Sequence, residues 1–246
     1  MKYPETEISS IGDLIQKLQA NVAGYDSPIW FRGHSISSWK LEPKLMRSTS
    51  LPPESYYLNR FKQDASIILS HRPSGEFEWL FLMQHYGMPT RLLDWSESPL
   101  TALYFAVTAN LTEAGALWIL LPSELNKKSN YKPDYDFEVP SFDDEHLKGY
   151  LPSTIAREAK SKLFPMAAIA PRNSPRMQSQ QGVFTISHRE NLPLEDVGAD
   201  GSPRDHIWKY IIQPNAKEVF KKELKLLGIN RFQLFPELES LSENLK

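Results

Sequence analysis

Cysteine is absent from this chain of 246 residues, which excludes disulfide bonds, thiolate metal sites and a cysteine nucleophile. The sequence also lacks a run of about 18 apolar residues, so it predicts no membrane-spanning helix. Its first residues, Met1-Lys2-Tyr3-Pro4-Glu5, lack the apolar core of a signal peptide. From these absences we expect a cytoplasmic protein with no membrane partner.

Excess charge of either sign is missing as well. The chain has 28 Lys and Arg against 30 Asp and Glu, a formal net charge of −2, which argues against a chain-wide attraction to nucleic acid but leaves a local basic groove open. Walker and Rossmann glycine patterns and the His-Glu-x-x-His pattern do not occur. We interpret Asp143-Asp144-Glu145-His146 as a solvated acidic stretch, and we predict no metal site.

The apolar fraction of 41% is enough for one well-buried core, so we predict a single domain over residues 1–246. Hydrophobic periodicity predicts both helices and strands. The helices are expected over residues 11–21, 54–71, 76–86 and 99–110, then from residue 215 to a cap at Gly228, with a last short helix after 236. The strands are expected over residues 29–34, 115–121, 166–170, 183–187 and 206–212. This order indicates an α+β fold, a small mixed or antiparallel sheet flanked by helices, with an irregular insertion at 122–165.

The densest group of polar side chains lies in residues 84–96, between two strongly apolar segments. It contains His85, Thr90, Arg91, Asp94 and Ser96. We predict a loop here that its flanks hold against the middle of the domain. Charged groups next to a core need partners, a ligand or a water-filled cleft.

Two other segments complete a pattern. Phe31-Arg32-Gly33 ends a predicted strand, which would put Arg32 where a strand meets a loop, and Gln180-Gln181-Gly182 belongs to a second polar loop. With the motif of residues 85–96, these segments resemble the FRG domain family, named for the Phe-Arg-Gly triplet. The resemblance spans about residues 29–184, and Leu234-Phe235-Pro236 is also similar to the family. It implies a bacterial protein, often encoded near mobile or defence elements, which suggests a role in phage defence or as a toxin.

Phe31-Arg32-Gly33 is also similar to the aromatic-Arg-Gly strand of arginine-specific ADP-ribosyltransferases. That faint similarity implies that Arg32 supports the phosphates of NAD and that Ser96 takes the place of the serine motif. Those enzymes use a glutamate at the place where this sequence has Gln180-Gln181. The departure argues against catalysis of that type.

The residue types themselves suit a nucleotide: arginines for phosphates, hydroxyls and a carboxylate for ribose, and an aromatic face for a base. Our first hypothesis is therefore a cleft that binds NAD, another nucleotide or a nucleic-acid-like ligand, and that acts on it if the protein is an enzyme. The candidate catalytic residues are His85, Asp94 and Gln181. The candidate binding residues are Arg32, Gly33, Thr90, Arg91 and Ser96.

The alternative is a structural lock in a non-catalytic interaction module that binds a protein partner. Arg32 would then pair with Asp94 to join two distant segments, and Arg91 would brace the same carboxylate. His85 would bond at a helix end without doing chemistry. Burial of the Arg32 and Asp94 side chains in direct contact, without an adjoining cleft, would favour this lock. The sequence leaves open whether the protein is an enzyme.

Overall fold

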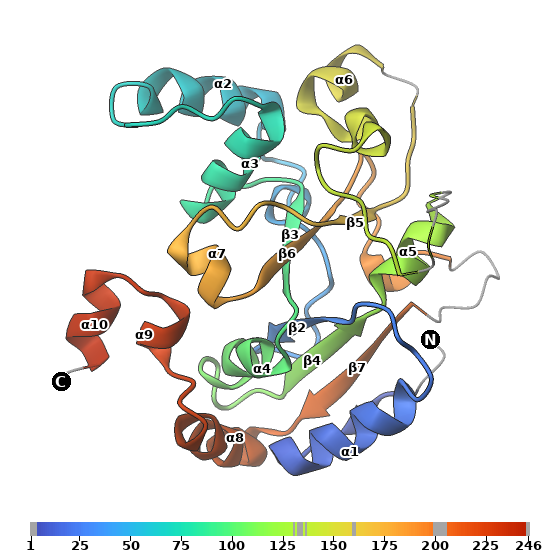
Figure 1. Ribbon diagram of the computed structural model, residues 1–246, viewed down its shortest axis with the longest axis vertical. Helices are drawn as coiled ribbons and strands as arrows, with labels where there is room; N and C mark the ends of the chain where they lie inside the picture. The colour runs from blue at the N-terminus through green and yellow to red at the C-terminus, as the bar shows by residue number, and fades with distance from the viewer. Residues whose placement is uncertain are drawn as a thin grey trace.

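The computed structural model of the chain describes residues 4–129, 131, 135, 137–158, 161–198 and 206–244. Seven strands form one sheet in the order β1-β7-β4-β2-β3-β6-β5 (Figure 1). The strands are β1 (Thr6–Glu7), β2 (Trp30–His34), β3 (Leu92–Ser96), β4 (Gly115–Leu120), β5 (Met166–Ala168), β6 (Gly182–Ile186) and β7 (Ile207–Ile212). The pair β1–β7 is parallel and the other pairs are antiparallel, which confirms the predicted α+β class with a mixed sheet.

Helices precede, separate and follow the strands. Several of them begin at a side-chain cap: Ser10, for example, accepts a hydrogen bond from the Asp13 N–H, and Ser98 accepts one from the Thr101 N–H. The α-helices are α1 (Ile11–Asn21), α2 (Glu54–Ala65), α3 (Glu76–His85), α4 (Pro99–Val107), α5 (Pro122–Lys128), α6 (Pro152–Arg157), α7 (Pro175–Ser179), α8 (Pro214–Leu226), α9 (Arg231–Leu234) and α10 (Leu238–Asn244). Short 3-10 helices are η1 (Lys44–Met46), η2 (Glu145–Tyr150) and η3 (Leu194–Asp196).

Alternating strand residues divide the core between the two faces of the sheet. On one face, α1, α4 and α8 cover β2, β4 and β7, and apolar residues of α2 and α3 cover β3, β5 and β6 (Figure 1). The opposite face carries a third cluster that includes Trp30, Trp95 and Trp118. The two helix groups on the first face therefore meet above the middle of the sheet, where β2 lies beside β3.

Gly33 and Gly115 let α4 approach the sheet closely. A Cβ atom at Gly33 would lie 1.8 Å from the carbonyl oxygen of Ala102, and one at Gly115 would lie 2.7 Å from that of Ala106. Both acceptors are backbone atoms of α4, so neither contact could be relieved by a side-chain rotation. The helix that follows β3 is thus positioned by glycines of its two neighbouring strands.

Two local predictions were wrong, and both concern the polar segments. Arg32 lies in the middle of β2, because that strand pairs with β4 over all five residues from Trp30 to His34. Residues 92–96 are not a loop but the strand β3, which pairs with β6 from Leu92↔Ile186 to Ser96↔Gly182. In both strands a charged residue interrupts an apolar run and hides the alternation.

The remaining differences are smaller. Helix α2 ends at Ala65 rather than at residue 71, and α7 lies inside the segment 171–182 that we predicted as a loop. The predicted insertion contains α5, η2 and α6. Its residues 130, 132–134, 136, 159 and 160 lie outside the described residues, as do Met1 to Tyr3 of the N-terminal segment.

None of the helices in the described ranges is both long and apolar enough to cross a membrane. The same ranges contain no group of three or more His, Cys, Asp or Glu side chains that could hold a metal ion.

Candidate functional site

A pocket with a volume of about 250 Å³ lies where the two helix groups meet. Residues of the strands β2, β3 and β6 and of α3, α4 and the α7 segment line it; Figure 1 labels these elements. Its polar and charged lining residues are Arg32, Gln84, His85, Asp94, Ser96, Thr101, Arg176 and Gln180. Aromatic side chains from the same elements, among them Phe81, Phe105 and Phe184, complete the lining.

Arg32 crosses from β2 to β3. Its Nη1 donates a hydrogen bond to the backbone carbonyl of Asp94, and its Nε donates to Nε2 of His34 at 3.0 Å. Burial lowers the pKa of Arg32 to about 10, against the opposing effect of the Asp94 carboxylate. The guanidinium is therefore charged at neutral pH, and two protein acceptors fix its orientation.

His34 orients Arg32, and it is a site residue that the sequence motifs did not indicate. The ring is buried, and burial followed by the charge of Arg32 lowers the pKa of His34 to about 3. A neutral ring that accepts at Nε2 carries its proton on Nδ1, which faces the carbonyl of Trp39 at 3.3 Å. The signal available in the sequence was a histidine two positions after Arg32, on the same side of a strand.

A chain of hydrogen bonds orients the carboxylate of Asp94. Nε2 of Gln84 donates to Oδ2 of Asp94 at 2.9 Å, and Oε1 of Gln84 accepts from the hydroxyl of Thr90 at 2.5 Å. Thr90 is fully buried and does not line the pocket, so it acts on Asp94 only through Gln84. Asp94 itself is exposed and is the carboxylate among the described lining residues.

His85 and Arg176 line the pocket from α3 and α7. Burial and then the charge of Arg176 lower the pKa of His85, whereas Glu237 raises it. The imidazole is consequently neutral at pH 7 and able to accept a proton. The guanidinium of Arg176 lies over the ring of Phe235, 4.7 Å from its centroid.

Gln180 and Gln181 take different positions relative to the pocket. Gln180 lines the pocket, and its carbonyl accepts a hydrogen bond of 2.6 Å from the hydroxyl of Ser96. Gln181 lies outside the lining and is exposed, with a φ of 48°. Its backbone carbonyl accepts from the Glu97 N–H at 3.1 Å. The structure therefore brings Gln180, not the candidate Gln181, into the pocket, and it uses the Ser96 hydroxyl to hold that loop.

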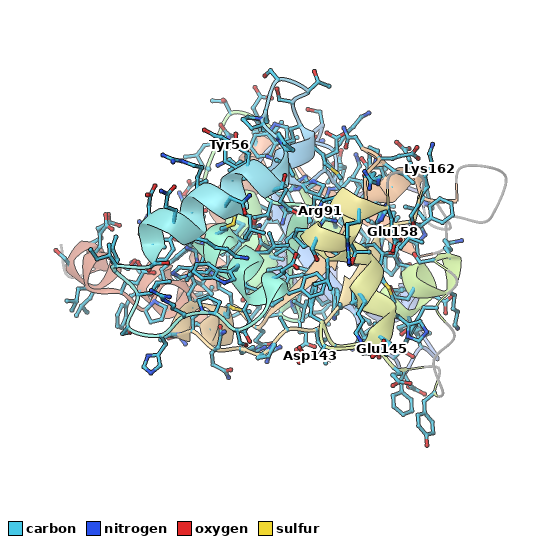
Figure 2. The ribbon with its side chains drawn as sticks, turned by 90° about the horizontal axis from the view of Figure 1, so that it is seen from above. Tyr56, Arg91, Asp143, Glu145, Glu158 and Lys162 are labelled. Carbon is cyan, nitrogen blue, oxygen red and sulfur yellow. The ribbon has the colours of Figure 1, made fainter. Side chains whose placement is uncertain are left out.

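Arg91 is part of a buried lock away from the pocket. Its Nε forms an ion pair of 2.8 Å with Glu54 of α2, and its backbone N–H donates to the same carboxylate at 2.9 Å. The other guanidinium nitrogens donate to the carbonyls of Ser187 and Tyr150. Figure 2 shows Arg91 between α2 and α6. Its position supports a structural role and gives it no access to a ligand in the pocket.

Neither side-chain pairing predicted for the lock is present, because Arg91 pairs with Glu54 and not with Asp94. Arg32 contacts Asp94 through a backbone carbonyl and has a pocket beside it, so the pair does not meet the criterion for a lock. Arg91 and Glu54 form a buried ion pair that the sequence did not predict. Gly33 lines the pocket, but its place in the sequence is explained by its contact with α4.

The sheet and this pocket define an α+β protein with a small cationic and aromatic site. The family model of the FRG domain matches residues 27–114, so the chain carries an FRG domain. The matched range includes Arg32, His85 and Asp94 but ends before Arg176 and Gln180, which complete the same pocket. No curated protein and no solved structure matches the chain significantly. The similarity to ADP-ribosyltransferases stays a prediction.

Proposed function

We propose that the pocket of this FRG-domain protein binds a nucleotide or another nucleic-acid-like anion. The observation that carries the proposal is the meeting of Arg32 and Arg176, from distant parts of the chain, with Asp94 in one partly aromatic pocket. Arginine donors suit phosphate oxygens, and a carboxylate accepts hydrogen bonds from ribose hydroxyls. The rings of Phe81 and Phe184, stacked with centroids 5.2 Å apart, offer an apolar wall to a base.

The size of the pocket favours a mononucleotide unit. Its volume of about 250 Å³ lies just below the range of roughly 300–1,000 Å³ that is common for drug-sized ligands. A mononucleotide unit therefore suits it better than a whole dinucleotide. NAD would place one of its halves in the pocket and the other outside.

Chemistry on the bound nucleotide would depend on Asp94 and His85. Asp94 has an orientation fixed by Gln84, and His85 is a neutral base. A reaction of the ADP-ribosyltransferase type would lack its glutamate, because Gln180 occupies that side of the pocket. We therefore favour a nucleotide-binding or nucleotide-hydrolysing role, in the bacterial defence or toxin setting that the FRG resemblance implies.

Isothermal titration calorimetry with AMP, ADP, NAD and a short RNA tests the proposal. Removal of one charged hydrogen bond costs about 1.5–3 kcal/mol, so Arg176→Ala should weaken binding by about tenfold or more. Arg172→Ala is the matched control, because Arg172 pairs with Glu97 and does not line the pocket. Absence of binding by the wild type, or equal binding by both variants, refutes the proposal.

The second candidate is the non-catalytic interaction module, which the buried lock of Arg91 and Glu54 favours. In that case the motif of residues 84–96 serves the fold, so Arg32→Ala or Asp94→Ala lowers the melting temperature and no substitution at the pocket changes nucleotide binding. The calorimetric panel separates the two candidates, since the module predicts no heat with any nucleotide.

A further inference from the structure

The C-terminal segment contacts residues that line the pocket, although it lies far outside the matched FRG range. We call residues 231–244, which include α9, Phe235 and α10, the C-terminal strap. The carbonyl of Leu234 accepts a hydrogen bond of 3.1 Å from Nε2 of Gln180. Figure 1 shows α9 next to α7, the helix that carries Arg176. The strap thus contacts the side of the pocket that the family match leaves out.

The guanidinium of Arg176 lies over the ring of Phe235. The ring centroid is 4.7 Å from Cζ of Arg176, and the ring meets that of Phe105 at 82° with centroids 5.9 Å apart. Arg176 and Phe105 both line the pocket. An aromatic ring beneath a guanidinium attracts the cation and restricts its position without using an N–H donor.

Contacts within the C-terminal strap hold its two helices together. Arg231 forms an ion pair of 2.8 Å with Glu243, which joins α9 to α10, and its guanidinium also lies 5.8 Å from the Phe235 ring. Among the described residues, no carboxylate forms an ion pair with Arg176. Arg176 therefore lies against an aromatic ring at the pocket, and it has no ion-pair partner among the described residues.

We infer that Phe235 is a positioning residue of the anion site, which orients Arg176 so that its N–H edge meets a phosphate group of the nucleotide. This inference rests on the proposed function and assigns the phosphate end of the ligand to the α7 side of the pocket. It also makes the C-terminal strap part of the site rather than a separate appendage.

The test compares two replacements of the ring in the full chain, with the nucleotide of the AMP, ADP and NAD panel that the wild type binds most tightly. Phe235→Leu keeps an apolar side chain but removes the ring, and we expect about fivefold weaker binding, the order of one partly exposed cation–π contact. Phe235→Tyr keeps the ring and should bind within about twofold of the wild type. Leu238→Ala, in the same strap and 85% exposed, is the control for unspecific effects.

A double-mutant cycle shows whether Phe235 acts through Arg176. In an Arg176→Ala background, Phe235→Leu should cause no further loss of affinity. Thermal denaturation checks that each variant is folded, and Phe235→Met replaces Phe235→Leu if the latter does not fold. Wild-type-like or tighter binding by Phe235→Leu, or an additive cycle, overturns the inference while leaving the proposed function intact. If the wild type binds no nucleotide, the proposed function fails and the inference fails with it.

Discussion

Gly33→Ala tests whether the glycine of the Phe-Arg-Gly triplet serves packing. The new Cβ would lie 1.8 Å from the carbonyl oxygen of Ala102 and 2.7 Å from the backbone nitrogen of Ala106. Ordinary contact begins at 3.4 Å, so α4 would have to move by about 1.6 Å, the difference between 3.4 and 1.8 Å. That movement would disturb the packing of Leu103 in α4 and Phe220 in α8, which are fully buried in the same cluster.

Overpacking a core usually costs about 1–3 kcal/mol. Because the clash here involves backbone atoms, we expect Gly33→Ala to lose at least about 3 kcal/mol from a total stability on the order of 5–15 kcal/mol. Urea unfolding followed by tryptophan fluorescence measures the loss. Gly12→Ala is the control, because its Cβ would meet nothing nearer than Ser10 Oγ at 3.8 Å and a helical alanine should add about 0.5–1 kcal/mol. If Gly33→Ala stays within about 1 kcal/mol of the wild type, the packing explanation is wrong.

Three further predictions concern the arginines and His34. Arg91→Ala leaves the carboxylate of Glu54 buried without its partner, so urea unfolding should show a loss of about 3–5 kcal/mol, and a loss below about 1 kcal/mol would contradict the lock. His34 is expected to make stability depend on pH: burial and then Arg32 hold its folded pKa at about 3 against 6.5 in the unfolded chain. The unfolded state therefore binds the extra proton, and stability should fall by up to about 1.4 kcal/mol per unit as pH drops from about 6.5 towards 3. The free energy of unfolding, measured at pH 7, 6 and 5, should change less with pH for His34→Asn than for the wild type. An equal dependence on pH in both proteins would contradict this prediction. Arg32→Lys keeps the charge, but one ammonium cannot reproduce the planar guanidinium that reaches both His34 and the Asp94 carbonyl. Calorimetry should therefore show about tenfold weaker nucleotide binding. Binding with the affinity of the wild type would contradict this prediction.

The sequence predicts those elements well whose apolar pattern is uninterrupted. Helix α4, with Ser98 as its cap and Pro99 in its first turn, and strand β4, buried at every position, are examples. Strand β3 was missed because Asp94 and Ser96 belong to a dense group of polar residues that resembles a loop, and its polar positions face the pocket. A polar strand in the middle of a sheet contradicts local propensity, and such conflicts are expected at functional sites.

The pocket was only partly predictable for a related reason. Arg32, His85, Asp94 and Ser96 belong to recognisable motifs, and the structure does bring these side chains together. Arg32 lines the pocket, whereas Arg91 forms a buried ion pair. The sequence could not tell these roles apart, because the partners of both arginines are distant along the chain. Glu54, for instance, lies 37 positions before Arg91. Pairings over such distances are set by the topology of the sheet, which periodicity does not reveal.

Arg176 was recognised only as part of a polar loop. Its role depends on Phe235, which the end of the chain brings next to α7, and the notable feature of the sequence was the Leu234-Phe235-Pro236 segment alone. A charged residue in a loop gains meaning only when its neighbours in space are known.

Methionine methyl NMR tests the central claim most directly, that the pocket between α3 and α4 binds a nucleotide. The chain has six methionines. Met177 lines the pocket, whereas Met166 is buried in the cluster formed with α2 and α3, and Met46 lies in η1. Titration of the ¹³C-methyl-labelled protein with AMP, ADP or NAD should shift the Met177 signal in a saturable manner and leave those of Met166 and Met46 in place. No shift at saturating nucleotide, or a shift confined to methionines outside the pocket, would contradict the claim.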